Sequence, residues 1–293
     1  MFDNRFRQKT IQLDDVLINL RIGGNGPPLL LLHGYPQTHL MWHQVAPFLG
    51  DYFTVICPDL RGYGGSSKPV GNKDHSNYSK RVMAKDQVQL MSKLGYEKFS
   101  VAGHDRGGRV AHRMALDYPD QIEKIAVLDI APTLTMFEAT DQAFATGYYH
   151  WFFLIQPDGL PEHMIGLDPD YYVREKLKRW SGRDFAFKPE VVSQYCRCFR
   201  DPAAIHASCE DYRAAATIDL AHDREDVEHK IANPLLILWG KQGFVEQRFD
   251  VLGCWREKAT NVKGHFLHCG HFLAEEKPLE LSAAFIEFFR PEF

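Results

Sequence analysis

The sequence predicts an α/β fold: a mostly parallel central sheet flanked by helices, with an inserted helical cap. Three observations support this prediction. Short continuous apolar runs recur along the chain, helical patterns lie between several of them, and one long segment without such runs interrupts the alternation. Apolar runs of this length are typical of strands buried on both faces of a parallel sheet, and their alternation with helices indicates crossover connections.

The predicted strands are the apolar runs themselves. The first segment, TIQLDDVLINLRIGG, alternates in polarity and predicts a strand hairpin. Helical spacing covers residues 80–94 and residues 107–117, between later runs. Those runs are LLLLHG at 29–34, FTVICPDL at 53–60, KFSVAGHD at 98–105, KIAVLDI at 124–130 and PLLILWG at 234–240.

The segment from 131 to 230 breaks the alternation. It contains no strand-like run, is rich in aromatic residues, and has helical spacing in FEATDQAFATGYYHWFFLI and PEVVSQYCRCF. A helical insertion into one α/β domain accounts for this pattern. We therefore expect a core made of residues 1–130 and 231–293, with a helical cap at 131–230.

The composition is that of an ordinary globular protein. Of 293 residues, 45% are hydrophobic and 25% charged, and the formal net charge is -4 without clusters of basic residues. No run reaches the roughly 18 apolar residues of a membrane helix, and the first residues lack the apolar region of a secretory signal. The six cysteines lack C-x-x-C spacing. We expect a cytoplasmic protein that binds neither nucleic acid nor a membrane.

A glycine-flanked turn, GHDRG at 103–107, follows a predicted strand and opens a predicted helix. This is the form of the nucleophile elbow of α/β-hydrolases, a strained turn that presents its central side chain above the sheet. The central residue here is Asp105. A carboxylate is ionised near pH 7 and can attack an electrophilic carbon directly, which leaves an aspartyl ester to be hydrolysed. The alternative is a capping aspartate in a glycine-rich turn.

A catalytic histidine follows the nucleophile late in the chain of such enzymes. His271 lies between Gly270 and Phe272, just before a helix-like C-terminal segment, and is the predicted base. It would take a proton from the water that attacks the ester. His265 and His268 lie close by and are the competing candidates.

The acid that orients this histidine is predicted to be Asp129. Many relatives place the acid after the strand predicted at 234–240, but no carboxylate follows that strand until Glu246. Asp129 instead lies at the carboxyl end of the strand predicted at 124–130, the edge where ligand-facing groups gather. It would hold His271 and stabilise its imidazolium form. The alternative is an aspartate that caps the entry to the helical segment.

The loop HGYP at 33–36 ends the first buried strand. In this fold that loop supplies one backbone N–H of an oxyanion hole, and the residue after the nucleophile supplies the other. The predicted amides are those of Tyr35 and Arg106. An ordinary Gly-x-Pro turn is the alternative.

With these residues in place, the chain resembles the fluoroacetate (haloacetate) dehalogenases, and the likeness covers nearly its whole length. The motif HGYPQTHLMWHQVAPFL and the aspartate elbow are shared with epoxide hydrolases and haloalkane dehalogenases. The more specific motifs are GHDRGGR at 103–109, YHW at 149–151 and CEDYRAAA at 209–216.

The resemblance implies roles for two arginines and three residues of the cap. Arg106 and Arg109 would bind the substrate carboxylate by forked, charge-assisted hydrogen bonds; the related enzymes usually have tryptophan in place of Arg106. His150, Trp151 and Tyr212 would donate hydrogen bonds to the departing halide. The alternatives are ion pairs with surface acids for the arginines and a buried helix face for the aromatic residues. No metal or organic cofactor is implied.

The expected activity is hydrolysis of 2-haloacetates, fluoroacetate and/or chloroacetate, to glycolate and halide through an ester of Asp105. Trp180 is a further candidate for the pocket wall, and the resemblance suggests a homodimer. Two alternatives are kept: an epoxide hydrolase, which would share the ester intermediate, and, from a different class, a ligand receptor that retains the fold without turnover.

Overall fold

A computed structural model describes residues 1–290; the last residues of the predicted core segment, 291–293, lie outside the described part. Its centre is an eight-stranded sheet with the order β1-β2-β4-β3-β5-β6-β7-β8. β1 and β2 pair antiparallel, as do β2 and β4, and all other neighbours are parallel. The strands are β1 (Arg7–Gln12), β2 (Leu17–Gly24), β3 (Pro28–Leu32), β4 (Thr54–Pro58), β5 (Phe99–His104), β6 (Ile122–Leu128), β7 (Leu235–Gly240) and β8 (Val262–Leu267).

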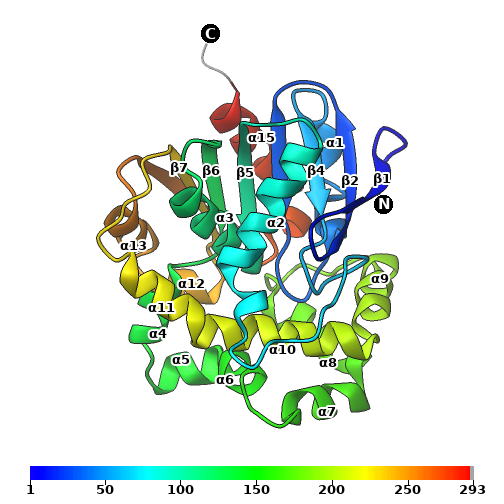
Figure 1. Ribbon diagram of the computed structural model, residues 1–293, viewed down its shortest axis with the longest axis vertical. Helices are drawn as coiled ribbons and strands as arrows, with labels where there is room; N and C mark the ends of the chain where they lie inside the picture. The colour runs from blue at the N-terminus through cyan, green and yellow to red at the C-terminus, as the bar shows by residue number, and fades with distance from the viewer. Residues whose placement is uncertain (291–293) are drawn as a thin grey trace.

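Helices cover both faces of this sheet (Figure 1). Along β3, Leu30 and Leu32 belong to one hydrophobic cluster while Leu29 and Leu31 belong to a second, because successive side chains of a strand point to opposite faces. α2 (Lys80–Lys93) and α3 (Arg106–Asp117) pack on the first cluster. α1 (Ala46–Leu49) and α15 (Pro278–Phe289) pack on the second. The remaining short core elements are η1 (His39–Trp42), η2 (Ser76–Tyr78), α12 (Phe244–Arg248), α13 (Val251–Lys258) and α14 (Leu273–Glu276).

The predicted fold class, including the N-terminal hairpin and the five apolar runs that become β3 to β7, is confirmed. β8 was not predicted from the sequence. It is an edge strand that, among the described residues, pairs with β7 alone, and most of its residues are exposed or partly exposed. Its sequence, VKGHFL, therefore includes polar residues and lacks the continuous apolar character of a strand buried on both faces.

Eight helices follow β6 and precede β7, and they lie together below the sheet in Figure 1. We call residues 133–225, which contain them, the cap; its boundaries as a separate domain stay a prediction. The stretch at 137–155 forms parts of three short helices, because Asp141 caps a new helix by accepting a hydrogen bond from the Phe144 N–H. The cap helices are α4 (Thr133–Glu138), α5 (Gln142–Gly147), α6 (Tyr149–Leu154), α7 (Leu160–Leu167), α8 (Pro169–Trp180), α9 (Pro189–Phe199), α10 (Pro202–Ala216) and α11 (Ile218–Glu225).

Within residues 1–290, none of the helices combines the length and the apolar character that a membrane crossing would need.

Candidate active site

Asp105 occupies a strained turn between β5 and α3. Its backbone has φ 49° and ψ −114°, outside the regions that residues other than glycine favour. Two glycines allow this turn. A Cβ on Gly103 would lie 2.2 Å from the carbonyl oxygen of Gly107, and a Cβ on Gly34 would lie 2.5 Å from the Cβ of Asp105. The sequence GHDRG therefore forms the sharp turn that its glycines predict.

The carboxylate of Asp105 is buried but held ionised. The backbone N–H of Tyr35 donates a hydrogen bond of 2.9 Å to its Oδ1. Burial raises the pKa of Asp105, but the positive charges of His271 and the two nearby arginines outweigh burial and bring the pKa below its usual range. The side chain is thus a carboxylate whose position is fixed by the loop after β3.

His271 and Asp129 lie side by side at the same edge of the sheet. Nδ1 of His271 lies 2.6 Å from Oδ2 of Asp129, whose Oδ1 accepts a hydrogen bond of 2.9 Å from the Gly240 N–H. Burial lowers the pKa of His271, but its hydrogen bond to Asp129 and the charges of Asp129 and Asp105 raise it above the usual value. Nε2 of His271 is buried and has no hydrogen-bond partner within residues 1–290. This nitrogen is therefore free to contact a small molecule.

His104, which the sequence analysis left without a role, supports the His271 loop. Its Nε2 lies 2.8 Å from the carbonyl oxygen of His271, and the two ring centroids are 4.4 Å apart. Burial lowers the pKa of His104 to about 3, so the ring is neutral. Since a carbonyl only accepts, Nε2 carries the proton. In the sequence, the position of His104 directly before the nucleophile was the one feature that could have indicated this contact.

Glu276 is a second supporting residue that the sequence did not single out. Its Oε2 accepts hydrogen bonds from the N–H groups of Gly270 (2.7 Å) and Gly182 (2.9 Å), and its Oε1 accepts one from the Phe272 N–H (3.0 Å). The backbone N–H of His271 in turn donates 2.8 Å to the carbonyl oxygen of Trp180. One carboxylate therefore ties the histidine loop to the segment that follows α8 of the cap.

Arg106 is paired with an acid, but not with the surface acid that the sequence analysis gave as the alternative. Its Nε and Nη2 donate to the carboxylate of Asp211, at 3.0 and 2.7 Å, and Nη2 also donates to the Asp211 carbonyl oxygen. Asp211 lies on α10 of the cap, is fully buried, and also binds Lys80 and Tyr63. Nη1 of Arg106 is buried and has no hydrogen-bond partner in the described chain.

Arg109 has no carboxylate partner among residues 1–290. Its Nη1 donates to the Ala131 carbonyl oxygen (3.1 Å) and to Thr133 Oγ1 (2.9 Å), and its Nη2 lies 3.2 Å from Met136 Sδ. Burial, followed by the charge of Arg106, lowers its pKa from the usual arginine value. Nε has no partner in the same part of the chain. Within residues 1–290, each of the two guanidinium groups therefore retains one buried nitrogen without a hydrogen-bond partner.

The three aromatic residues predicted to meet the halide are buried together in the cap. His150 and Trp151 lie on α6 and Tyr212 on α10, and each is at most 2% exposed. The ring centroids of His150 and Tyr212 are 5.7 Å apart. The guanidinium carbon of Arg106 lies 4.2 Å from the Tyr212 ring centroid, and that of Arg109 lies 4.8 Å from the Trp151 ring centroid. The predicted set is thus gathered next to the elbow.

These aromatic residues are not only a buried helix face, because their polar atoms lack partners. Trp151 Nε1, Tyr212 Oη and His150 Nδ1 are buried and make no hydrogen bond within residues 1–290. Burial, together with nearby positive charges, lowers the pKa of His150 well below its usual value, so its ring is neutral. Buried polar groups are nearly always paired, and several unpaired ones at one place indicate a site for a ligand.

A cavity of about 80 Å³ opens beside these residues, between the carboxyl ends of the strands and the cap. It is far smaller than the roughly 300 to 1,000 Å³ of pockets for drug-sized ligands. The lining of this cavity does not include Arg106, Arg109, Trp151 or Tyr212. Its lining includes the predicted residues Asp105, Asp129, His150, Trp180 and His271, together with Tyr148.

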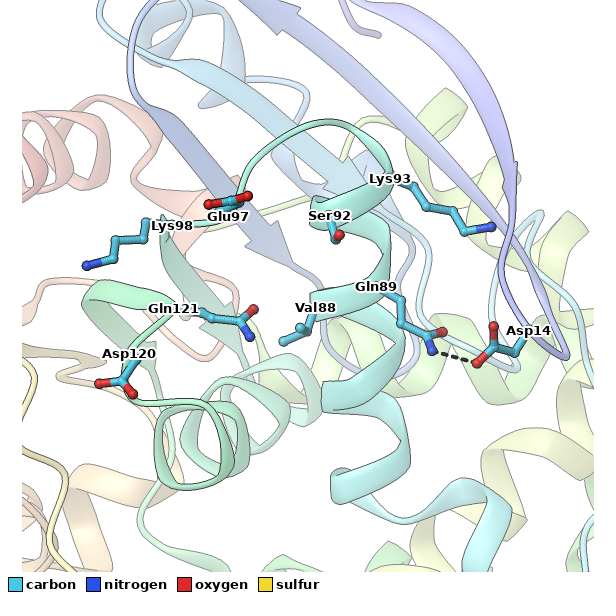
Figure 2. Close-up of a pocket in the computed structure, with 9 residues that line it drawn as sticks. All are labelled: Asp14, Val88, Gln89, Ser92, Lys93, Glu97, Lys98, Asp120 and Gln121. Carbon is cyan, nitrogen blue, oxygen red and sulfur yellow. Dashed lines mark hydrogen bonds between the residues drawn. The ribbon is translucent and has the colours of Figure 1, made fainter.

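A larger groove, of about 580 Å³, lies on the outer surface beside α2 and is a useful contrast (Figure 2). Its polar side chains are spread along the walls, and Gln89 donates to Asp14 rather than toward the middle of the groove. Volume alone therefore does not identify a candidate site; buried polar atoms without partners, gathered near a carboxylate, are the more specific indication.

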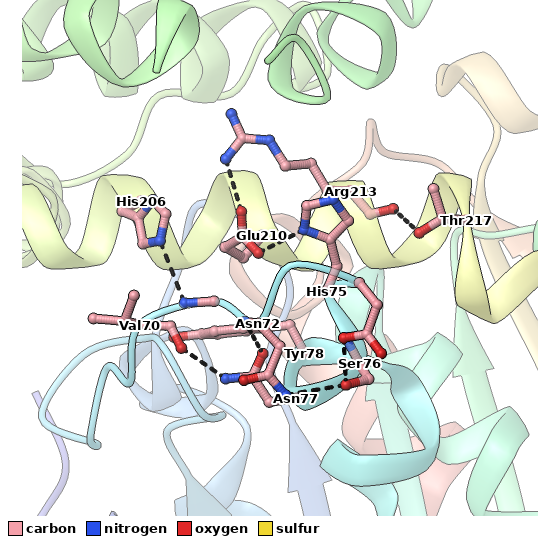
Figure 3. Close-up of polar contacts among 12 residues, drawn as sticks. Val70, Asn72, His75, Ser76, Asn77, Tyr78, His206, Glu210, Arg213 and Thr217 are labelled. Carbon is pink, nitrogen blue, oxygen red and sulfur yellow. Dashed lines mark hydrogen bonds and ion pairs between the residues drawn. The ribbon is translucent and has the colours of Figure 1, made fainter. Parts of the chain in front are cut away.

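Polar contacts on another side of α10 fix the position of this helix against the core (Figure 3). Glu210 Oε2 lies 2.7 Å from Nδ1 of His75, and Glu210 Oε1 accepts 2.8 Å from Arg213. His75 belongs to the loop before η2 of the core. Because Asp211 and Tyr212 are the next residues along α10, these contacts also hold the two residues that meet Arg106.

The comparisons with known proteins agree with this geometry. Residues 27–278 match the family model described as the alpha/beta hydrolase fold. A crystal structure of a proposed alpha/beta hydrolase from Nostoc sp. PCC 7120 is 58% identical and has a TM-score of 0.97, covering 98% of this chain and 99% of that one.

Two curated relatives narrow the class. A fluoroacetate dehalogenase from Burkholderia sp. is 48% identical over 98% of this chain and 95% of its own length. A soluble epoxide hydrolase from Corynebacterium sp. (strain C12) is 36% identical over 92% of each chain. The chain thus belongs to the alpha/beta hydrolase fold family and, within it, to the haloacetate dehalogenase family, which confirms the resemblance seen in its motifs.

Proposed function

We propose that this protein hydrolyses 2-haloacetates, fluoroacetate and/or chloroacetate, to glycolate and halide through an ester of Asp105. The observation that carries the proposal is the environment of this ionised carboxylate. Two arginines beside it each keep a buried N–H without a partner, and three cap residues keep unpaired polar atoms. A substrate that is an anion at one end and releases an anion at the other would use both groups of donors.

In the first step, the free N–H groups of Arg106 and Arg109 would bind the substrate carboxylate. Asp105 then attacks the α-carbon, a carbon–oxygen bond forms, and the carbon–halogen bond breaks with its electron pair leaving on the halide. His150, Trp151 and Tyr212 would receive the halide. Donors that meet the leaving group as its charge develops lower the barrier, and the effect matters most for fluoride, a poor leaving group.

In the second step, His271 would take a proton from water, and the water oxygen would attack the ester carbonyl carbon. Negative charge then develops on the former Asp105 oxygen, close to the backbone amides of Tyr35 and Arg106. Collapse of this intermediate releases glycolate, which accepts the proton from His271, and restores the Asp105 carboxylate. The hydrogen bond from the Tyr35 N–H to Asp105 Oδ1 and the pairing of His271 with Asp129 support this assignment.

Halide release from fluoroacetate and chloroacetate, followed with ion-selective electrodes beside a diol assay with styrene oxide, tests the proposal. The relative at 36% identity makes epoxide hydrolysis the second candidate. The two arginines beside Asp105, each with a buried nitrogen that has no partner within residues 1–290, favour a small anionic substrate. Diol formation without halide release would replace the proposal by that candidate. No product from either class would favour a ligand receptor.

Three further proposals concern the domain boundaries, the cellular location and the oligomeric state. We infer that residues 1–130 with 231–293 and residues 131–230 act as core and cap domains, that the protein is cytoplasmic, and that it forms a homodimer. The homodimer is supported by apolar side chains exposed together on α7 and α8: Leu160, Met164, Leu167 and Tyr171, each about half exposed or more. Light scattering of the purified protein would give its mass in solution.

A further inference from the structure

Lys176 of α8 is a buried ammonium group that the proposed reaction leaves unexplained. The residue is 2% exposed, and its Nζ has neither a hydrogen-bond partner nor an ion-pair partner within residues 1–290. Three aromatic rings surround the ammonium. Its Nζ lies 3.9 Å from the ring centroid of Tyr149, 5.1 Å from that of Trp180 and 5.2 Å from that of Tyr172.

This group is a neighbour of the predicted halide site. The indole of Trp180, which Lys176 contacts, also lies 4.7 Å from the ring centroid of His150. Nδ1 of His150 is buried and has no partner in the described chain. After burial, the charge of Lys176 is the largest influence that lowers the pKa of His150. The two side chains are therefore electrostatically linked although no hydrogen bond joins them.

An isolated buried charge of this kind weakens the fold. Contacts with aromatic faces offset only part of the cost of removing an ammonium group from water. The titratable groups around it are Tyr149 and His150 of α6 and Tyr172, Glu175 and Arg179 of α8. The single acid among them, Glu175, is the preceding residue and pairs with Arg179 rather than with Lys176. Burial accordingly lowers the pKa of Lys176 to about 7. A buried lysine with a lowered pKa beside a reaction site points to a role in function rather than in stability.

We propose that Lys176 is a positioning residue of the halide site: its unpaired ammonium acts through His150 and adds positive potential where the departing halide collects. The proposal rests on the proposed function. In a buried site the attraction between a cation and a developing anion is weakly screened. The same charge disfavours a second proton on His150, which keeps the ring neutral with a single N–H. No proton leaves Lys176 during the step.

Three variants test the role. Lys176→Met keeps the length of the stem and removes the charge, Lys176→Arg keeps the charge, and Lys178→Met removes an exposed charge from the same helix as a matched control. We expect Lys176→Met to lower kcat for fluoroacetate about tenfold and kcat for bromoacetate by no more than about threefold, because bromide leaves more readily. Lys176→Arg should recover most of the loss, and Lys178→Met should match the wild type.

The thermal midpoint separates this role from a structural one. If the ammonium is kept for function, Lys176→Met should unfold at the same or a higher temperature than the wild type, since an unpaired buried charge is removed. A lower midpoint together with equal losses for both substrates would show that Lys176 only fills the aromatic box, and would overturn the proposal.

The pH profile is a further readout. The wild-type kcat for fluoroacetate should fall as the pH rises through about 7, where Lys176 loses its proton. Lys176→Met should lack this fall because it has no such group, and Lys176→Arg should lack it because arginine stays charged. The loss of activity on the acid side, which belongs to His271, should remain in all of them. An unchanged alkaline limb in Lys176→Met would contradict the proposal.

Bromide binding tests the proposal without turnover. Quenching of tryptophan fluorescence during a bromide titration at about pH 6 should give a dissociation constant several-fold weaker for Lys176→Met than for the wild type. If the wild type releases no halide from either substrate but bromide binds and depends on Lys176, the proposed function fails and the halide site stands. Equal bromide binding by both proteins would reject the role of Lys176 alone.

Discussion

The acids of the core and three aromatic residues of the cap contribute to the candidate site in opposite ways. The acidic groups from the core are already paired: Asp105 accepts from Tyr35, and Asp129 holds His271 while accepting from Gly240. Three aromatic residues of the cap, His150, Trp151 and Tyr212, are buried with polar atoms that make no hydrogen bond within residues 1–290. The core therefore fixes its carboxylates in position, whereas these three cap residues, like Arg106 and Arg109 of the core, keep polar atoms free for a ligand. The predictions below test this difference.

The largest effect is expected at the elbow. Asp105→Ala should reduce halide release from chloroacetate by at least about 10⁴-fold, because both halves of the reaction pass through this carboxylate. Halide-electrode assays would measure the loss, and an unchanged thermal midpoint would show that the elbow still folds. Residual activity above about one hundredth of the wild type would mean that water attacks the substrate without an ester at Asp105.

His271→Ala should separate the two halves of the reaction. We expect one halide per active site to be released in a burst, followed by turnover that is about 10³-fold slower, because only ester hydrolysis needs the base. Mass spectrometry of the quenched protein should then detect the ester on the peptide that contains Asp105. Loss of the burst itself would contradict the assignment of His271 to ester hydrolysis alone and would give it a part in the first step.

The cap donors are tested by Tyr212→Phe, which removes the hydroxyl and keeps the ring against Arg106. The kcat for fluoroacetate should fall about 10² -fold and that for bromoacetate much less, because the better leaving group depends less on donors. Comparing the two substrates at saturation gives the ratio. Equal losses would indicate that the hydroxyl positions the substrate rather than receiving the halide.

The smallest effect is expected where core and cap meet. Glu276→Gln keeps one acceptor oxygen and loses another among the bonds to Gly182, Gly270 and Phe272. Ester hydrolysis should slow by about 10-fold, as for other groups that orient a catalytic residue, while the halide burst keeps its rate. Rapid-quench measurement of both phases checks this. A slower burst would show that Glu276 shapes the substrate pocket as well as the histidine loop.

The sequence predicts those features of the structure that neighbouring residues form, and misses those that depend on contacts between distant residues. The strands from β3 to β7 are continuous apolar runs, and the elbow carries its own glycines, so both were predicted. The edge strand β8 has mixed polarity and was missed. The family motifs supplied Arg106 and Tyr212, but the pairing of Arg106 with Asp211 joins residues 105 positions apart. That contact, like the bond of Glu276 to Gly182 and the aromatic contacts of Lys176, depends on how the cap packs and has no local signal.

The buried pair of Arg106 and Asp211 has a consequence for the nucleophile. A buried arginine without a counterion would be attracted to Asp105, whose pKa its charge already lowers, and a carboxylate engaged by both arms of a guanidinium is a poor nucleophile. By accepting hydrogen bonds from Nε and Nη2 of Arg106, Asp211 leaves one guanidinium nitrogen, Nη1, without a partner in the described residues and available to the substrate. A cap transplanted from a relative would therefore have to bring its own acid at this position, or the core would inhibit itself.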